Sequence, residues 1–71
     1  MKLSQLLYNL ERTQPIVVDD YETPLDRNNL FIGEVHDIKK DNPINKFHIE
    51  SIIADASIIY VLVNSNYGKL L

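Results

Sequence analysis

The chain has 71 residues, enough for one small domain, and a chain of this length buries only about 60% of the surface that its unfolded form exposes. Ten Asp and Glu against seven Lys and Arg give a net charge of −3, which disfavours binding to the phosphate backbone of nucleic acids. Cysteine is absent, so neither a disulfide nor a Cys-based zinc site adds stability. Association with further copies is the remaining way to stabilise so small a fold.

The first predicted element is an amphipathic helix that starts near Ser4 as its N-cap and ends before Pro15. Its apolar stripe consists of Leu3, Leu6, Leu7 and Leu10. The polar residues among these leucines exclude the uninterrupted apolar core of a signal peptide. The longest apolar run of the chain, at 58–63, is too short to span a membrane. We therefore expect a cytoplasmic protein with no membrane partner.

Four strands are predicted after the helix, at 15–21, 30–38, 47–53 and 57–63, from runs rich in Ile, Val and aromatic residues. An acidic loop at 19–29 follows the first strand, and the polar connection at 39–45 has room for one short helical turn. Gly33 lies inside the second strand, where a glycine suggests a bulge or close contact with the leucine stripe. The expected fold is a single α+β domain over 1–63, with one N-terminal helix on a four-stranded, mainly antiparallel sheet, followed by a flexible tail at 64–71.

The last strand carries no polar interruption except one tyrosine hydroxyl, whereas a half-exposed strand alternates apolar and polar residues. One short helix covers only one face of a sheet, so the other face needs a different partner. The sequence therefore predicts a homo-oligomer that associates through Ile58, Ile59, Tyr60, Val61, Leu62 and Val63. The alternative is a monomer in which the loop at 19–29 or the tail at 64–71 folds over the second face.

Catalytic and metal-binding patterns are weak in this sequence. His36-Asp37 and His48-x-Glu50 are the only pairings of histidine with carboxylates, and neighbouring strands could bring them together. Two histidines without a third firm ligand are more often surface or hydrogen-bonded residues. A glycine-rich phosphate loop is absent, so we predict no catalytic residue, no metal and no cofactor. A nucleotide could still bind at a subunit junction through backbone N–H groups and the cations Arg27, Lys39, Lys40 and Lys46.

The acidic loop is the predicted surface for a protein partner. Carboxylates next to an aromatic ring and an arginine are suited to the rim of an interface with a basic protein. The residues concerned are Asp19, Asp20, Tyr21, Glu22, Asp26 and Arg27. A loop that is simply solvated is the alternative, and the spacing of its carboxylates does not match a calcium-binding loop.

Three segments carry a resemblance: the leucine-rich start at 2–7, the stretch Phe31-x-Gly33-x-Val35-x-Asp37-Ile38, and Ile49-Glu50-Ser51-Ile52 before the final apolar strand. Over residues 2–63 the chain resembles small, uncharacterised accessory proteins of phages and prophages of Gram-positive bacteria. The resemblance implies a phage setting, in which small proteins block components of host defence. We therefore expect a non-enzymatic protein that inhibits a host defence component by binding a protein target. The alternative is a homo-oligomeric sponge that sequesters a nucleotide immune signal between subunits.

Overall fold

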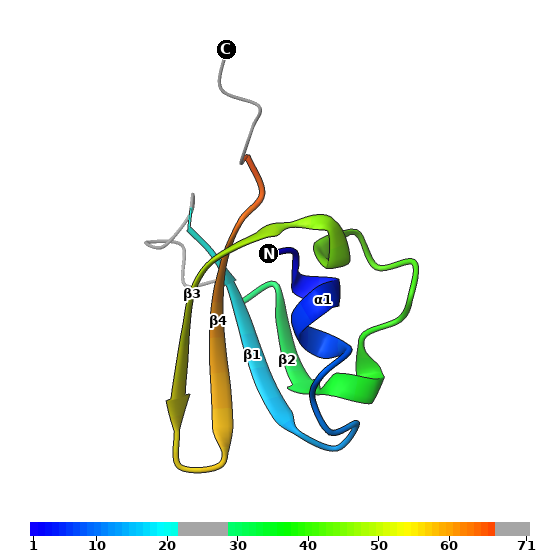
Figure 1. The fold of residues 1–71 in the computed structure, drawn as a ribbon, viewed down its shortest axis with the longest axis vertical. Coiled ribbons are helices and arrows are strands. Elements are labelled where there is room, and N and C mark those ends of the chain that lie inside the picture. The colour runs from blue at the N-terminus through cyan, green and yellow to red at the C-terminus, as the bar shows by residue number, and fades with distance from the viewer. Residues whose placement is uncertain (22–28, 67–71) are drawn as a thin grey trace.

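A computed structural model describes residues 1–21 and 29–66 as one helix, two 3₁₀ turns and four strands (Figure 1). In chain order the elements are α1 (Leu3–Leu7), β1 (Pro15–Asp20), β2 (Phe31–Glu34), η2 (Val35–Asp37), η3 (Pro43–Lys46), β3 (His48–Asp55) and β4 (Ile58–Asn64). The predicted α+β class, with one N-terminal helix and four strands, is confirmed. Within the described residues, the structure contains no helix that could span a lipid bilayer.

The sheet has the strand order β2-β1-β4-β3, and its two central strands come from opposite ends of the chain. β1 pairs antiparallel with β2, and β3 pairs antiparallel with β4. β1 and β4 run parallel, with Ile16 opposite Ile59 and Val18 opposite Val61. The sheet is therefore mixed. Its two outer pairings are antiparallel, as predicted, whereas the parallel pairing at its centre was not predicted.

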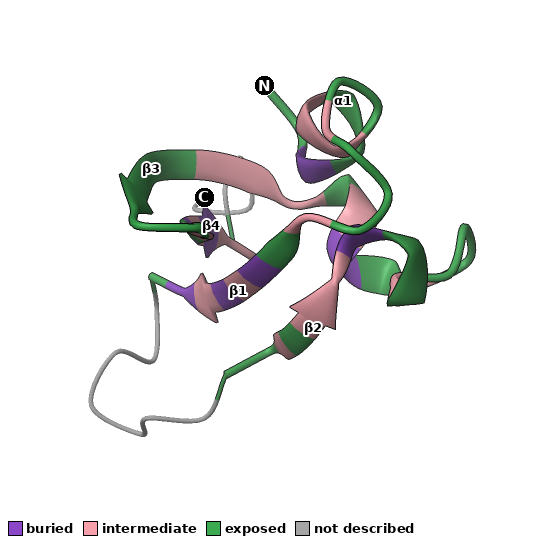
Figure 2. Cartoon of the chain, turned by 90° about the horizontal axis from the view of Figure 1, so that it is seen from below, coloured by how far each residue is buried: buried purple, intermediate pink, exposed green. Residues whose placement is uncertain are grey.

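One face of the sheet is covered by α1, η2 and η3. Figure 2 shows the buried residues of β1 and β4, together with the side of α1 that faces the sheet. In the described part of the chain, seven apolar side chains form this core: Leu3, Ile16, Val18, Val35, Ile44, Val61 and Val63. Leu6, Leu7 and Leu10 pack against the core and are partly buried, so the predicted leucine stripe does face the sheet.

The helix is shorter than its leucine pattern predicts. It begins after Lys2, whose backbone N–H donates to the side chain of Gln5, so the predicted N-cap at Ser4 is wrong. After Leu7 the backbone tightens, because Asn9 N donates to Leu6 O and Leu10 N to Leu7 O. Isolated helices of this length are marginal in water, so packing on the sheet must hold α1.

Backbone hydrogen bonds tie the cover to the sheet at both ends. At one end, Leu3 N donates to Phe47 O at 3.0 Å and Ile49 N donates to Met1 O at 2.8 Å, which extends β3 by an isolated bridge. At the other end, Val35 N and His36 N of η2 donate to carbonyl groups of the loop that follows α1. The cover is thus fastened by the backbone as well as by its apolar side chains.

The second strand also ends earlier than predicted, at Glu34 in place of Ile38. Asp37 accepts a hydrogen bond from Glu34 N at 3.1 Å and thereby caps the 3₁₀ turn η2, which directs Val35 into the core. A Cβ at Gly33 would lie 3.0 Å from the ring of Phe31 and 3.2 Å from the Asp37 carboxylate. Gly33 therefore makes room for its own strand and for η2, and the predicted contact with the leucine stripe is wrong.

Smaller differences concern the connections. The short helical turn expected at 39–45 is confirmed as η3, where Asn42 accepts a hydrogen bond from Ile44 N at 3.1 Å. The turn between β3 and β4 contains Ala56, whose φ of 55° is unusual for a residue other than glycine. Of the predicted tail, Asn64 belongs to β4 and residues 65–66 form a turn. The rest of that tail lies outside the described residues.

Candidate binding sites

The face of the sheet opposite α1 carries an apolar row that crosses all four strands. Val17 is the register partner of both Ile32 on β2 and Tyr60 on β4, and Tyr60 is the partner of Ile53 on β3. Residues directly opposite one another on paired strands point to the same face. We call this set, Ile32, Val17, Tyr60 and Ile53, the open-face row.

The ends of the open-face row are exposed. Ile32 is 66% exposed, Ile53 is 61% exposed and the aromatic Tyr60 is 39% exposed. Single exposed apolar side chains are common on protein surfaces, but a contiguous row of them marks an interaction surface. The alternative, in which 19–29 or 64–71 covers this face, depends largely on residues 22–28 and 67–71, which lie outside the described part.

Alternation along β4 divides the residues predicted for self-association into two groups. Ile59, Val61 and Val63 share the face of the buried β1 residues Ile16 and Val18 and belong to the covered side. The residues on the open side are Ile58, Tyr60 and Leu62. The last strand is thus apolar on both faces, as its sequence indicates, and only these three are placed to meet a second molecule. Self-association itself stays a prediction.

The acidic residues predicted to bind a partner occupy different environments. Asp20 is only 9% exposed, and its carboxylate accepts hydrogen bonds from the hydroxyl of Ser65 at 2.6 Å and from Ser65 N at 3.4 Å. Asp19 is half-buried and accepts a hydrogen bond from the side chain of Asn29. Tyr21 is 53% exposed. The other predicted residues, Glu22, Asp26 and Arg27, lie outside the described residues.

The two histidine pairings are not brought together. They belong to β2 with its following turn and to β3, which form opposite edges of the sheet. His36 directs Nε2 to Glu34 at 2.6 Å and Nδ1 to Asp37 at 3.4 Å. These three side chains form a metal-sized cluster, but an ion can take only one ring nitrogen and would have to displace a contact already made. Elsewhere, Glu50 accepts a hydrogen bond from the Asn64 side chain at 3.0 Å.

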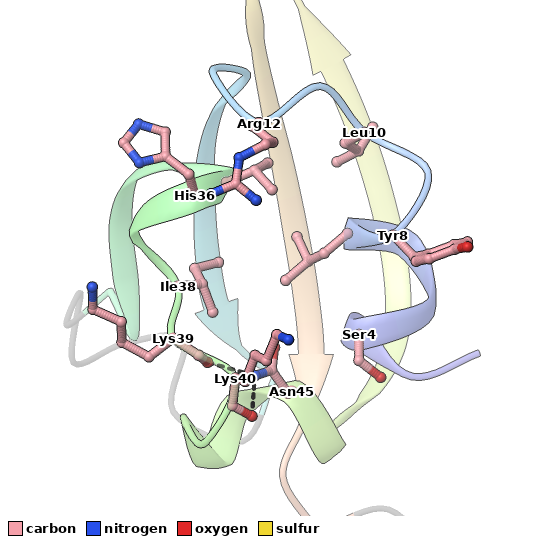
Figure 3. A pocket seen from close by; sticks show the side chains of 11 residues that line it. Ser4, Tyr8, Leu10, Arg12, His36, Ile38, Lys39, Lys40 and Asn45 are labelled. Carbon is pink, nitrogen blue, oxygen red and sulfur yellow. Dashed lines mark hydrogen bonds between the residues drawn. The ribbon is translucent and has the colours of Figure 1, made fainter.

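A groove of about 590 Å³ lies on the covered side of the molecule, between α1 and the segment that joins η2 to η3 (Figure 3). Its apolar lining is Leu7, Leu10, Val35 and Ile38. Its polar lining is Ser4, Tyr8, Arg12, His36, Lys39, Lys40 and Asn45. Within 1–21 and 29–66, no carboxylate lines this groove, although the chain as a whole is acidic.

Backbone and amide hydrogen bonds hold the walls of the groove. His36 N donates to Arg12 O at 2.9 Å, and Val35 N donates to Gln14 O at 3.0 Å. At the other end, the side chain of Asn45 donates to the carbonyls of Lys39 at 2.8 Å and Lys40 at 3.2 Å. The two backbone contacts join segments more than twenty positions apart, so no local pattern connects Arg12 with Lys40.

The cations of the groove differ in direction. In Figure 3 the side chains of Arg12 and Lys40 point toward the groove from opposite ends, with Ile38 between them, whereas Lys39 extends away. Within residues 1–21 and 29–66, neither Arg12 nor Lys40 makes an ion pair or a side-chain hydrogen bond. The groove therefore combines an apolar floor with two cationic groups that have no carboxylate partner there.

A second, smaller hollow of about 400 Å³ lies near the start of β3. Its lining includes the cations Lys2 and Lys46 and the ring of Phe47. This hollow can serve as a control site for the larger groove, because substitution can remove two cations from either one.

Comparison of the chain with protein-family models, with curated proteins and with solved structures found no match.

Proposed function

We propose that this chain is a non-enzymatic binding protein that docks a protein against the open face of its sheet, and that a second copy is one such partner. The observation that supports the proposal is the open-face row, which runs from one edge of the sheet to the other. Burial of an exposed Ile side chain contributes about 1.5–3 kcal/mol, so its two outer isoleucines are the main source of affinity.

The size of the open face sets the strength of self-association. Four strands spaced about 4.8 Å apart and about 20 Å long present roughly 400 Å² of flat surface, so two copies bury about 800 Å² together. Interfaces below about 1,200 Å² belong to weak or transient complexes. We therefore expect copies to exchange readily, with a dissociation constant in the micromolar range or above, which leaves the face available to another protein.

Substitution of two neighbouring isoleucines on β3 tests this proposal. Ile53 belongs to the open-face row, whereas Ile52 is the partner of Val61 and lies on the other face at 46% exposure. Both side chains are exposed in the single chain, so lysine is tolerated at either position. Ile53→Lys places two like charges in a symmetric interface and should weaken self-association by about tenfold or more, since unpaired buried charge is costly. Ile52→Lys makes the same change of charge and should leave self-association unaltered.

Sedimentation velocity over a concentration series measures these effects. Wild-type protein that stays monomeric up to near-millimolar concentration would contradict self-association. Equal weakening by both lysine variants would instead indicate pairing through the exposed edge of β3, and would refute packing through the open face.

We further propose that the protein target is a component of host defence in the cytoplasm, as the resemblance to phage accessory proteins implies. A candidate defence protein should bind wild-type chain and Ile52→Lys with similar affinity, and Ile53→Lys about tenfold more weakly. Binding that is equal for all three would place the target elsewhere on the surface. The alternative is a homo-oligomeric sponge that holds a nucleotide between subunits. Of the cations proposed for it, Lys39 and Lys40 line a groove within one chain.

A further inference from the structure

We propose that the groove between α1 and the η2–η3 segment binds a small phosphate-bearing molecule with an aromatic or apolar body, of the size of a mononucleotide. The proposal goes beyond protein docking, because this site lies on the covered side of the sheet and the open-face row lies on the other.

The charge of the groove points to an anion. The chain carries an excess of three acidic residues, yet among the residues that the structure describes the groove is lined by three Lys and Arg side chains and by no carboxylate. Two acidic side chains contact the groove residue His36, and both of them, Glu34 and Asp37, are engaged with its ring. Cations without carboxylate partners around a concave surface attract anions, and Arg and Lys are the usual ligands of phosphate.

The floor of the groove points to more than an inorganic ion. Four aliphatic side chains line it, and Ile38 lies between the two inward-pointing cations in Figure 3. A free phosphate would leave this apolar surface wet, whereas a flat ring would cover it. The volume of about 590 Å³ falls in the range typical of sites for small molecules and cofactors.

The two cations would have separate roles. The backbone of Arg12 is held by the hydrogen bond from His36 N to its carbonyl, which fixes the base of this side chain at one end of the groove. A planar guanidinium can donate two parallel hydrogen bonds to phosphate oxygens. Lys40 reaches in from the opposite end on a flexible stem and adds a point charge. The ligand would thus be held at its phosphate by these groups and at its ring by the aliphatic floor.

Calorimetric titration with the four ribonucleoside diphosphates ADP, GDP, CDP and UDP tests the proposal. At least one should bind. The matching nucleoside and inorganic phosphate should each bind at least about tenfold more weakly, because the nucleoside lacks the phosphate contacts and inorganic phosphate lacks the contacts of the ring. Affinity should also fall as salt is added, because the contacts are ionic. Absence of binding by all four diphosphates at millimolar concentration would overturn the proposal, as would equal binding of the nucleoside.

Paired glutamine variants locate the site. Arg12→Gln with Lys40→Gln should weaken binding by about tenfold or more, since two charge-assisted contacts are lost. Lys2→Gln with Lys46→Gln removes the same charge from the smaller hollow and should leave binding unaltered. Equal loss in both double variants would show attraction by overall charge and would refute a specific site. Self-association should be the same in both, so failure of this proposal is distinguishable from failure of the open-face proposal.

Discussion

Alanine at two successive positions of β1 measures how differently the two faces of the sheet are buried. Val18 is fully buried against the core, whereas Val17 is half-buried in the open-face row. The substitution Val→Ala removes the same two methyl groups and the same β-branching at either position. The difference between the two variants therefore reports burial alone.

The expected magnitudes follow from this difference. Loss of two buried methyl groups costs about 1.6 kcal/mol in transfer free energy, and the cavity left behind raises the total for Val18→Ala to about 2–3 kcal/mol. Val17→Ala should cost less than about 1 kcal/mol in the monomer, because solvent already reaches its side chain. A domain of this size has an unfolding free energy of about 4–10 kcal/mol, so only the first variant approaches the threshold of folding.

Urea denaturation followed by circular dichroism gives both values, at a concentration low enough to keep the chain monomeric. Repetition at high concentration should increase the cost of Val17→Ala, because association buries that side chain. If Val17→Ala cost as much as Val18→Ala in dilute solution, the open face would be covered within the chain, and the reasoning behind the proposed docking surface would be refuted.

Two further predictions concern turns. Ala56→Gly should stabilise the protein by about 0.5–1 kcal/mol, because a φ of 55° strains alanine but not glycine. Ala54→Gly within β3 should destabilise it by a similar amount. A lower melting temperature for Ala56→Gly would contradict this account. Ser65→Ala should lower the free energy of unfolding, measured by chemical denaturation, by about 1–2 kcal/mol, because it removes a hydrogen bond to the buried Asp20 carboxylate. Ser51 is exposed, so Ser51→Ala should change that free energy by less than about 0.5 kcal/mol. Equal effects would show that the Asp20 contact is unimportant.

Short-range patterns predicted the elements of this fold well. β-branched runs located all four strands, because such residues fit a pleated and partly buried surface. The leucine spacing located α1, although the helix stops at Leu7 and the leucine at position 10 reaches the core from a tighter turn. The end of β2 at Glu34 was not predicted, because polar residues determine it. Asp37 caps a 3₁₀ turn by accepting a hydrogen bond from Glu34 N, within a stretch whose alternating apolar residues suggest a longer strand.

Long-range features were beyond the sequence patterns. Periodicity gives the faces of a strand but not its neighbour, so the parallel pairing of β1 with β4 could not be read from it. The groove has Arg12 and Lys40 at opposite ends, on segments that only the fold brings together. The same holds for Asp20, which looked like part of an exposed acidic surface and is instead buried beside Ser65.

The parallel pairing at the centre of the sheet also bears on how the chain reaches its native state. β1 and β2 form one antiparallel unit and β3 and β4 another, and within the sheet the parallel pairing of β1 with β4 joins them. Ile16 meets Ile59, so the segment between them must close as a long loop before the central contacts can form. We expect this closure to limit the folding rate, with hairpin formation by β3 and β4 preceding it. A nascent chain would then stay without a core until β4 has left the ribosome.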